Sequence, residues 1–153
     1  MANILTLVFN PDPRLRLRST EIPESDIPGY ASLVEDMGAS MKKYKGIGLA
    51  APQIGQNIRL VIVSTKEGPI ALFNPVIKKK SLLKAWDEEG CLSIPHVFGD
   101  VRRHVKLQCE FTDLEGQRRL IEAEGLLARV IQHEIDHIDG ILFIDKAKNI
   151  REA

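Results

Sequence analysis

The chain has 153 residues, of which 44% are hydrophobic and 27% are charged, and its 21 basic and 21 acidic residues give a formal net charge of zero. These values are typical of a globular protein, and we expect one domain that spans residues 1–153. The zero net charge argues against a broad nucleic-acid surface or a polybasic membrane patch. No apolar run approaches membrane-spanning length, and the N-terminus lacks the pattern of a signal peptide. With two cysteines and no secretory signal, we expect a protein of the reducing cytoplasm.

The first third of the chain predicts one helix after irregular segments. Four prolines restrict the backbone over residues 7–28, where we expect loops. Apolar residues then recur at every fourth position within residues 29–45, which predicts a helix with one buried face. The recurring residues are Leu33, Met37 and Met41.

A glycine-rich segment follows this expected helix at residues 46–55. Its three glycines allow the backbone to approach a ligand closely and to expose N–H groups. The segment is a poor match to a phosphate-binding loop, because no Gly-Lys-Ser/Thr sequence follows it. Gln53 is its one long polar side chain. Two roles are open for Gln53: solvation at the surface, or an amide donor directed into a site.

Residues 59–122 predict a series of strands separated by turns. Apolar and polar positions alternate over residues 101–111, which is typical of a half-buried strand. Residues 88–95 are expected to form a turn that presents a cysteine, and residues 113–117 predict a hairpin turn. The expected strands are residues 59–63, 70–77, 81–87, 101–111 and 118–122.

The last expected helix carries a His-Glu-x-x-His sequence that begins at His133. On a helix, His133 and His137 lie on the same face, one turn apart, with Glu134 beside them. Two imidazoles with an adjacent carboxylate are typical of a metal-activated hydrolase, in which the glutamate is the general base and not a ligand. The alternative is a pair of histidines that only hydrogen-bond to their neighbours.

A third ligand has to come from upstream, because no His or Cys follows His137. Cys109 lies on the apolar face of an alternating strand and is expected to be an inert core residue. Cys91 lies in a glycine-flanked turn among acidic residues, so it is the better ligand, bound as a thiolate. One cysteine and two histidines leave a tetrahedral position open for water, which is the catalytic pattern.

Three segments resemble, in order, the signature motifs of the peptide deformylase family, and residues 10–15 resemble its N-terminal start. The resemblance implies an α+β fold: one domain in which antiparallel β-sheets pack around a C-terminal helix that carries His-Glu-x-x-His, with one N-terminal helix. It also implies a bacterial, monomeric enzyme that removes the formyl group from the initiating formyl-methionine of nascent polypeptides and releases formate. One Fe2+ per chain is the expected metal, with Zn2+, Ni2+ or Co2+ as substitutes. The three segments are Gly46–Gln53, Glu89–Ser93 and Gln132–His137.

Positions matched to the family imply a role for each site residue. A metal lowers the pKa of its bound water, and Glu134 accepts the proton as the hydroxide attacks the formyl carbon, then passes it to the departing amine. The amide of Gln53 and the backbone N–H of Leu92 would stabilise the oxyanion. The implied metal ligands are Cys91, His133 and His137, and the expected substrate-binding residues are Gly46, Ile47, Gly48, Gly90 and Val130.

Two residues near the motifs depart from the family pattern. His96 stands where the family commonly has glycine, and Phe98 stands where many members carry an arginine near the substrate backbone. We expect His96 at the surface, and we assign no contact with the substrate peptide to His96 or Phe98. Glu89 and Arg103 match family positions that are structural. Many members continue into a long C-terminal helix linked to ribosome docking, and this sequence provides no support for a ribosome contact.

Two alternative functions remain open from the sequence. A peptidase of the His-Glu-x-x-His kind would need a third ligand downstream of His137, and cleavage of an internal peptide bond would reveal it. A catalytically silent relative with a vestigial metal site would be indicated by the loss of Glu134, Cys91 or Gln53, all of which are present.

Overall fold

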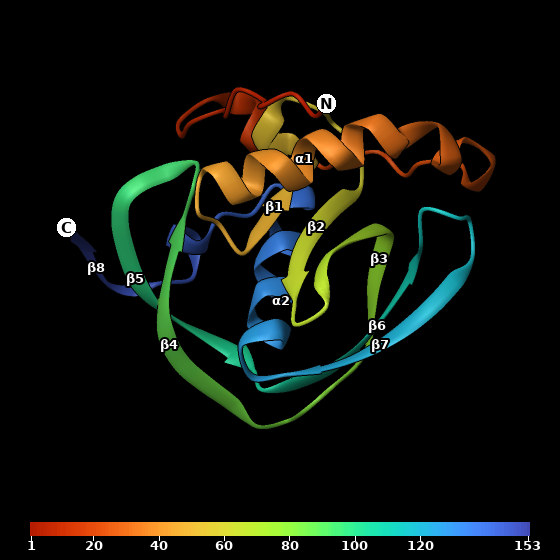
Figure 1. The fold of residues 1–153 in the computed structure, drawn as a ribbon. Coiled ribbons are helices and arrows are strands. Elements are labelled where there is room, and N and C mark those ends of the chain that lie inside the picture. The colour runs from red at the N-terminus through yellow and green to blue at the C-terminus, as the bar shows by residue number, and fades with distance from the viewer.

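The computed structural model describes residues 1–153 as two antiparallel sheets and two α-helices (Figure 1). The helices are α1 (Ala31–Lys43) and α2 (Gly125–Ile138), with the shorter 3-10 helices η1 (Pro13–Arg16), η2 (Glu24–Tyr30), η3 (Ala51–Ile54) and η4 (Phe143–Asp145). The strands are β1 (Gly48–Ala50), β2 (Leu60–Thr65), β3 (Gly68–Lys80), β4 (Lys84–Cys91), β5 (Ile94–His104), β6 (Lys106–Thr112), β7 (Arg118–Glu124) and β8 (Lys148–Glu152).

The two sheets lie on either side of α2. One sheet has the order β1-β2-β3-β6-β7 and the other has the order β4-β5-β8. Figure 1 shows α2 between the two sheets, with α1 across the top of the view, near the N-terminus. The expected α+β arrangement of antiparallel sheets around the motif helix, with one N-terminal helix, is confirmed. None of the helices combines the length and the apolar character needed to cross a membrane.

The apolar face of α2 packs on the five-stranded sheet. Ala128 and Ile131 are fully buried there against Leu72 of β3 and Cys109 of β6. Burial raises the pKa of the Cys109 thiol to about 12, so this cysteine is the neutral core residue expected from its strand position. This packing fixes one side of the motif helix and leaves its other side to face the three-stranded sheet.

The N-terminal helix α1 agrees with the expected helix to within two residues at each end. Met37 and Met41 are buried in a second apolar cluster, with Leu49 and Phe73. The backbone leaves the helix at Tyr44 and turns through Lys45, which has a φ of 60°, a left-handed conformation. This turn directs the glycine-rich segment toward the side of α2.

The strand expected over residues 101–111 is wrong as a single element. β5 ends at His104 and β6 begins at Lys106, and the chain passes from one sheet to the other between them. Alternation continues through the break, since Arg103 and Leu107 are both buried, which is why the pattern resembles one strand. The side chain of Gln132 on α2 accepts from the N–H of His104 (3.0 Å) and donates to its carbonyl (2.9 Å), so it stabilises the backbone at the break.

Two further expectations are corrected near the motif cysteine and the C-terminus. The expected turn over residues 88–95 is a β-hairpin: β4 continues through Cys91, and only Leu92 and Ser93 form the turn before β5. β8 was not expected, because all five of its residues are exposed and no apolar alternation marks it. It pairs with the outer side of β5. Parts of the expected N-terminal loops also form short 3-10 helices.

Candidate metal centre

Three expected metal ligands come together from two elements. Cys91 lies at the end of β4, and His133 and His137 lie one turn apart on α2. One potential ligand atom from each of the three residues falls within 4.8 Å of the others. Cys91 Sγ is 3.2 Å from His137 Nε2, and the two imidazole rings have centroids 5.0 Å apart. The spacing of the histidines follows from the helix, whereas the position of the cysteine follows from the hairpin.

The hairpin needs a glycine beside the cysteine. Gly90 pairs with Phe98 across β4 and β5. A Cβ atom at residue 90 would lie 2.9 Å from the Phe98 ring, closer than a side chain tolerates. Gly90 therefore lets the aromatic ring lie flat against the strand that carries Cys91.

Glu89 orients the first histidine. Its carboxylate accepts from His133 Nδ1 at 2.9 Å, so Nδ1 carries a proton and Nε2 is the nitrogen that a metal ion would bind in place of a second proton. Arg103 donates two hydrogen bonds to the same carboxylate, both at 2.9 Å, and Arg129 donates a third at 2.7 Å. Burial alone would raise the pKa of Glu89, but the hydrogen bonds from His133 and Arg103 hold it well below its usual range.

The two histidines have opposite electrostatic environments. Burial lowers the pKa of His133, but the neighbouring Cys91 sulfur, the hydrogen bond to Glu89 and the charge of Glu134 raise it to about 10. Burial, and then the nearby charge of His133, lower the pKa of His137 well below its usual value. The same acidic groups that attract a proton to His133 would attract a divalent cation.

A buried atom without a hydrogen-bond partner also fits a site for a ligand or ion. Glu134 Oε1 is such an atom, and Glu134 lines the cavity. His137 Nδ1 is also unpaired, but it is the ring nitrogen opposite the Nε2 atom that meets Cys91. Such groups are rare in folded proteins and call for an explanation, which a ligand, an ion or an ordered water provides. The donor set of one thiol and two imidazoles suits Zn2+, Fe2+ and related divalent cations.

Glu134 is placed beside these ligands but is not among them. Burial raises its pKa to about 7, with the charge of His133 acting in the opposite direction. A Cβ atom at Gly48 would overlap the Glu134 carboxylate and would lie 2.9 Å from Val130. The glycine of β1 is therefore required for the carboxylate to lie against the backbone, and this close approach keeps Glu134 out of water.

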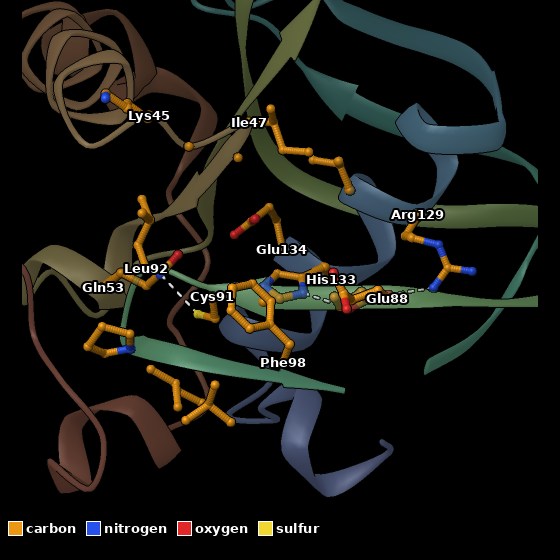
Figure 2. Close-up of a pocket in the computed structure, with 18 of the residues that line it drawn as sticks. Lys45, Ile47, Gln53, Glu88, Cys91, Leu92, Phe98, Arg129, His133 and Glu134 are labelled. Carbon is orange, nitrogen blue, oxygen red and sulfur yellow. Dashed lines mark hydrogen bonds and ion pairs between the residues drawn. The ribbon is translucent and has the colours of Figure 1, made fainter. Parts of the chain in front are cut away.

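Gln53 faces the site, so the surface alternative for this residue is wrong. Only 2% of Gln53 is exposed, and its Oε1 accepts from the N–H of Ala50 at 2.9 Å. That bond directs Nε2 toward Ser93 Oγ, at 3.1 Å, and Cys91 Sγ, at 3.5 Å. Figure 2 shows Cys91 between Gln53 and His133, with Glu134 close by.

The site opens into a cavity of about 520 Å³. Leu92 lies beside Gly46 on its wall, where a Cβ atom at residue 46 would be 2.8 Å from Leu92 Cδ1. His96 is exposed at the cavity rim, as expected, and is not one of the grouped ligands, while Phe98 is half-buried in the wall. The expected residues that line the cavity are Gly46, Ile47, Gly48, Gln53, Gly90, Cys91, Leu92, Val130, His133 and Glu134, and His137 lies behind them.

Two residues of this environment had no expected role. Arg129 and Gln132 precede the motif on α2, and both are buried by contacts with β4 and β5. A weak sequence signal existed, because an arginine inside an otherwise apolar helical run must find partners when it is buried. Which partners it finds depends on strands that are distant in the sequence.

Comparisons with known proteins agree with this geometry. The chain matches the model of the family described as Polypeptide deformylase over residues 4–153. The peptide deformylase of Desulfitobacterium hafniense is 47% identical over 133 residues, which are 86% of this chain and 88% of that protein. The chain belongs to the polypeptide deformylase family. The resemblance inferred from the three motifs is thereby confirmed, and with it the assignment to a family of metal-dependent hydrolases.

Solved structures of deformylases share the whole fold. The crystal structure of the peptide deformylase from Thermotoga maritima superposes with a TM-score of 0.91 at 34% identity, covering 95% of this chain and 99% of that chain. A class I type b peptide deformylase from Acinetobacter baumannii with Met-Ala-Ser bound superposes with a TM-score of 0.90 at 28% identity, covering 95% and 99%. The two sheets around α2 are therefore the deformylase fold.

Proposed function

We propose that the protein removes the formyl group from the formyl-methionine at the start of nascent polypeptides and releases formate. The observation that carries this proposal is the convergence of Cys91, His133 and His137 with the buried Glu134 at one cavity, in a chain of the deformylase family. The related enzyme from Acinetobacter baumannii is solved with Met-Ala-Ser bound. That peptide corresponds to the methionine-first product of deformylation, which supports a peptide beginning with methionine as the occupant of this cavity.

Cys91, His133 and His137 would hold one divalent cation per chain. When bound, the cation supplies acidity to a water ligand and polarises the carbonyl oxygen of the substrate. We propose Fe2+ as the native metal, as the resemblance to the family implies. Zn2+, Ni2+ and Co2+ are proposed as substitutes, because a ligand set of one sulfur and two nitrogens accepts each of these metals.

Glu134 would move the proton during the reaction. It accepts a proton from the water whose oxygen forms the new bond to the formyl carbon, and it gives that proton to the amine nitrogen as the carbon–nitrogen bond breaks. Formate and a free methionine amine result. A pKa of about 7 suits both steps, because a carboxyl group that titrates near the working pH can act first as base and then as acid.

Gln53 and the backbone N–H of Leu92 would stabilise the oxyanion. The bond from Ala50 holds the Gln53 amide with its Nε2 directed toward Cys91, so the donor needs no reorganisation during the reaction. Donors held in place in this way are commonly the largest single contribution to acyl-transfer catalysis.

The methionine side chain and the peptide backbone would occupy the rest of the cavity. Val130 and Ile47 supply apolar surface, and Gly46, Gly48 and Gly90 line the cavity with backbone that packs closely on Leu92, Glu134 and Phe98. We further propose that the chain acts as one domain and as a monomer in the bacterial cytoplasm, where formyl-methionyl nascent peptides are its partners.

Formate release from a formyl-Met-Ala peptide tests the function directly. Protein loaded anaerobically with Fe2+ is expected to release formate, and Glu134→Ala is expected to lower kcat/KM by about 100- to 10,000-fold with the metal still bound. Metal content measured on the same samples separates loss of chemistry from loss of the ion. No release from fully metallated protein would contradict the proposal and favour a silent metal-binding relative. Cleavage of an internal peptide bond without formate release would favour the peptidase alternative.

A further inference from the structure

The residues that converge at the metal centre belong to elements that pack on different partners. α2 is fixed by its apolar face on the five-stranded sheet, whereas Cys91 belongs to β4, the edge strand of the other sheet. A shift of β4 away from α2 would separate Cys91 from the histidines without unfolding either sheet. Side-chain contacts between β4 and α2 must therefore set the distance between these two elements.

Arg129 makes three contacts across this gap. It lies on α2 one turn before His133, and only 9% of it is exposed. Its Nη1 donates to Glu89 Oε2 at 2.7 Å and to the carbonyl of Val101 at 2.8 Å, and its Nη2 donates to the carbonyl of Ala85 at 2.8 Å. One side chain of α2 thus binds two points on β4 and one on β5. Figure 2 shows Arg129 extending from α2 on the same helix as His133.

Arg129 is one of two buried arginines that pair with Glu89. Arg103 pairs with Glu89 and also with Asp136 of α2, at 2.6 Å. Two buried arginines therefore face two carboxylates. The side chain of Arg103 bonds only to carboxylates, whereas Arg129 also donates to the Ala85 and Val101 carbonyls. A neutral residue at 129 would remove one of the two arginines that pair with the buried Glu89 carboxylate and would leave the Ala85 and Val101 carbonyls without this donor.

We propose that Arg129 is a positioning residue for the metal centre. It holds β4 at the distance from α2 at which Cys91 meets the histidines, and it orients Glu89 so that His133 presents Nε2. Arg129 acts through β4 and Glu89 and has no part in the chemical steps. The proposal rests on the ligand set proposed above, but it is independent of which substrate the enzyme hydrolyses.

Metal affinity of purified variants, measured by competition with a chelator for Co2+ and for Zn2+, tests the proposal. Arg129→Met is expected to weaken binding by about 10- to 100-fold, which is typical of losing a residue that supports a metal ligand from behind. Arg129→Lys keeps the charge but cannot reach three acceptors with a planar fork, so we expect a loss of roughly 3- to 10-fold. The absorption band of Co2+ bound to thiolate should weaken in parallel.

Arg59, which directly precedes β2, provides a matched control, because it is a buried arginine whose side chain also bonds to α2. It is 7% exposed and donates to the Ile138 carbonyl and to Asp139, both at 2.9 Å, at the opposite end of α2 from Arg129. Its side chain bonds neither β4 nor Glu89. Arg59→Met should lower the thermal stability of the metal-free protein as Arg129→Met does, while its metal affinity changes by less than about threefold.

The outcomes separate this proposal from the proposed function. If Cys91→Ser and His137→Ala abolish tight metal binding but Arg129→Met binds Co2+ as the unaltered protein does, the positioning role is wrong and the ligand set stands. If those two ligand variants keep their affinity, the ligand set itself is wrong. Should Arg129→Met not fold, Arg129→Lys decides, because an unchanged affinity in that variant overturns the proposal.

Discussion

The pKa of the Glu134 carboxyl group depends on the absence of a side chain at Gly48 on the neighbouring strand β1. Gly48 lets the backbone of β1 lie against Glu134, and the burial that results raises the pKa of the carboxyl group to about 7. Helical spacing was enough to predict that Glu134 lies beside the two histidines. The burial that tunes it comes from a segment more than eighty residues earlier, which spacing along the helix does not reveal.

Gln53 offers a test of oxyanion stabilisation. Gln53→Ala removes the Nε2 donor, and we expect kcat for deformylation to fall by about 100- to 1,000-fold while KM changes by less than about threefold, because the lost bond would form in the transition state. Metal content should be unchanged, since Gln53 is not a proposed ligand. Steady-state kinetics on a formyl-methionyl peptide provide the measurement, and a variant with nearly unaltered kcat would remove Gln53 from the catalytic set.

The two cysteines should differ sharply toward a thiol reagent. Cys91 is partly exposed at the cavity, whereas Cys109 is fully buried with a pKa of about 12 and remains a neutral thiol at ordinary pH. In folded, metal-free protein we expect one thiol to be modified, and in the metal-loaded protein none. Denaturant should expose the second thiol. Mass spectrometry of the labelled peptides identifies the site, and early labelling of Cys109 would contradict the prediction.

Among the elements, the β4–β5 hairpin and its contact with α2 matter most for the site. The recurrence of apolar residues predicted α1, and apolar runs and turn residues predicted α2 and most of the strands, because these patterns act over neighbouring residues. They did not predict the break between β5 and β6, where Gln132 from α2 pairs with the backbone of His104. The Gln132 amide bonds the backbone of His104 where a neighbouring strand would otherwise do so. The break is thus stabilised by a contact between distant segments, and the alternation of buried side chains continues through it.

The contact between η1 and η4 predicts a pH dependence of stability. Arg16 donates to the Asp145 carboxylate, and this hydrogen bond holds the pKa of Asp145 below its ordinary value of 3.8. A lowered pKa in the folded state stabilises the protein above the pKa of the unfolded state, and that contribution is lost as the pH falls through the folded-state pKa.

We therefore expect Asp145→Asn to reduce the free energy of unfolding by up to about 1 kcal/mol at pH 6, a small value because both side chains are partly exposed. The difference between the variant and the unaltered protein should shrink as the pH is lowered below about 4. Urea unfolding at several pH values measures it. Arg16→Gln should show the same trend, and a difference that grows toward acidic pH would contradict this account.

Across the whole molecule, a metal held by Cys91, His133 and His137 would link the two sheets through α2. Removing the metal with a chelator should lower the unfolding temperature, and a metal present at a hundred times its dissociation constant should stabilise the fold by about 2.7 kcal/mol. We expect a single cooperative transition in both states, since one helix packs against both sheets. Calorimetry with and without Zn2+ checks this. Two separate transitions would contradict a single domain over residues 1–153.

The sequence alone determined the family, the fold class and the local geometry of the motif helix. Spacing of four residues places His133 and His137 on one face of any helix, and an alternating strand buries Cys109, because both patterns act over neighbouring residues. Only the tertiary structure decided the rest. It showed that Glu89 on β4 accepts from His133, more than forty residues away, that Arg129 connects α2 to β4, and that β8 covers the edge of β5. Contacts of this kind join elements that are distant in the sequence, so the local periodicity of the sequence does not reveal them.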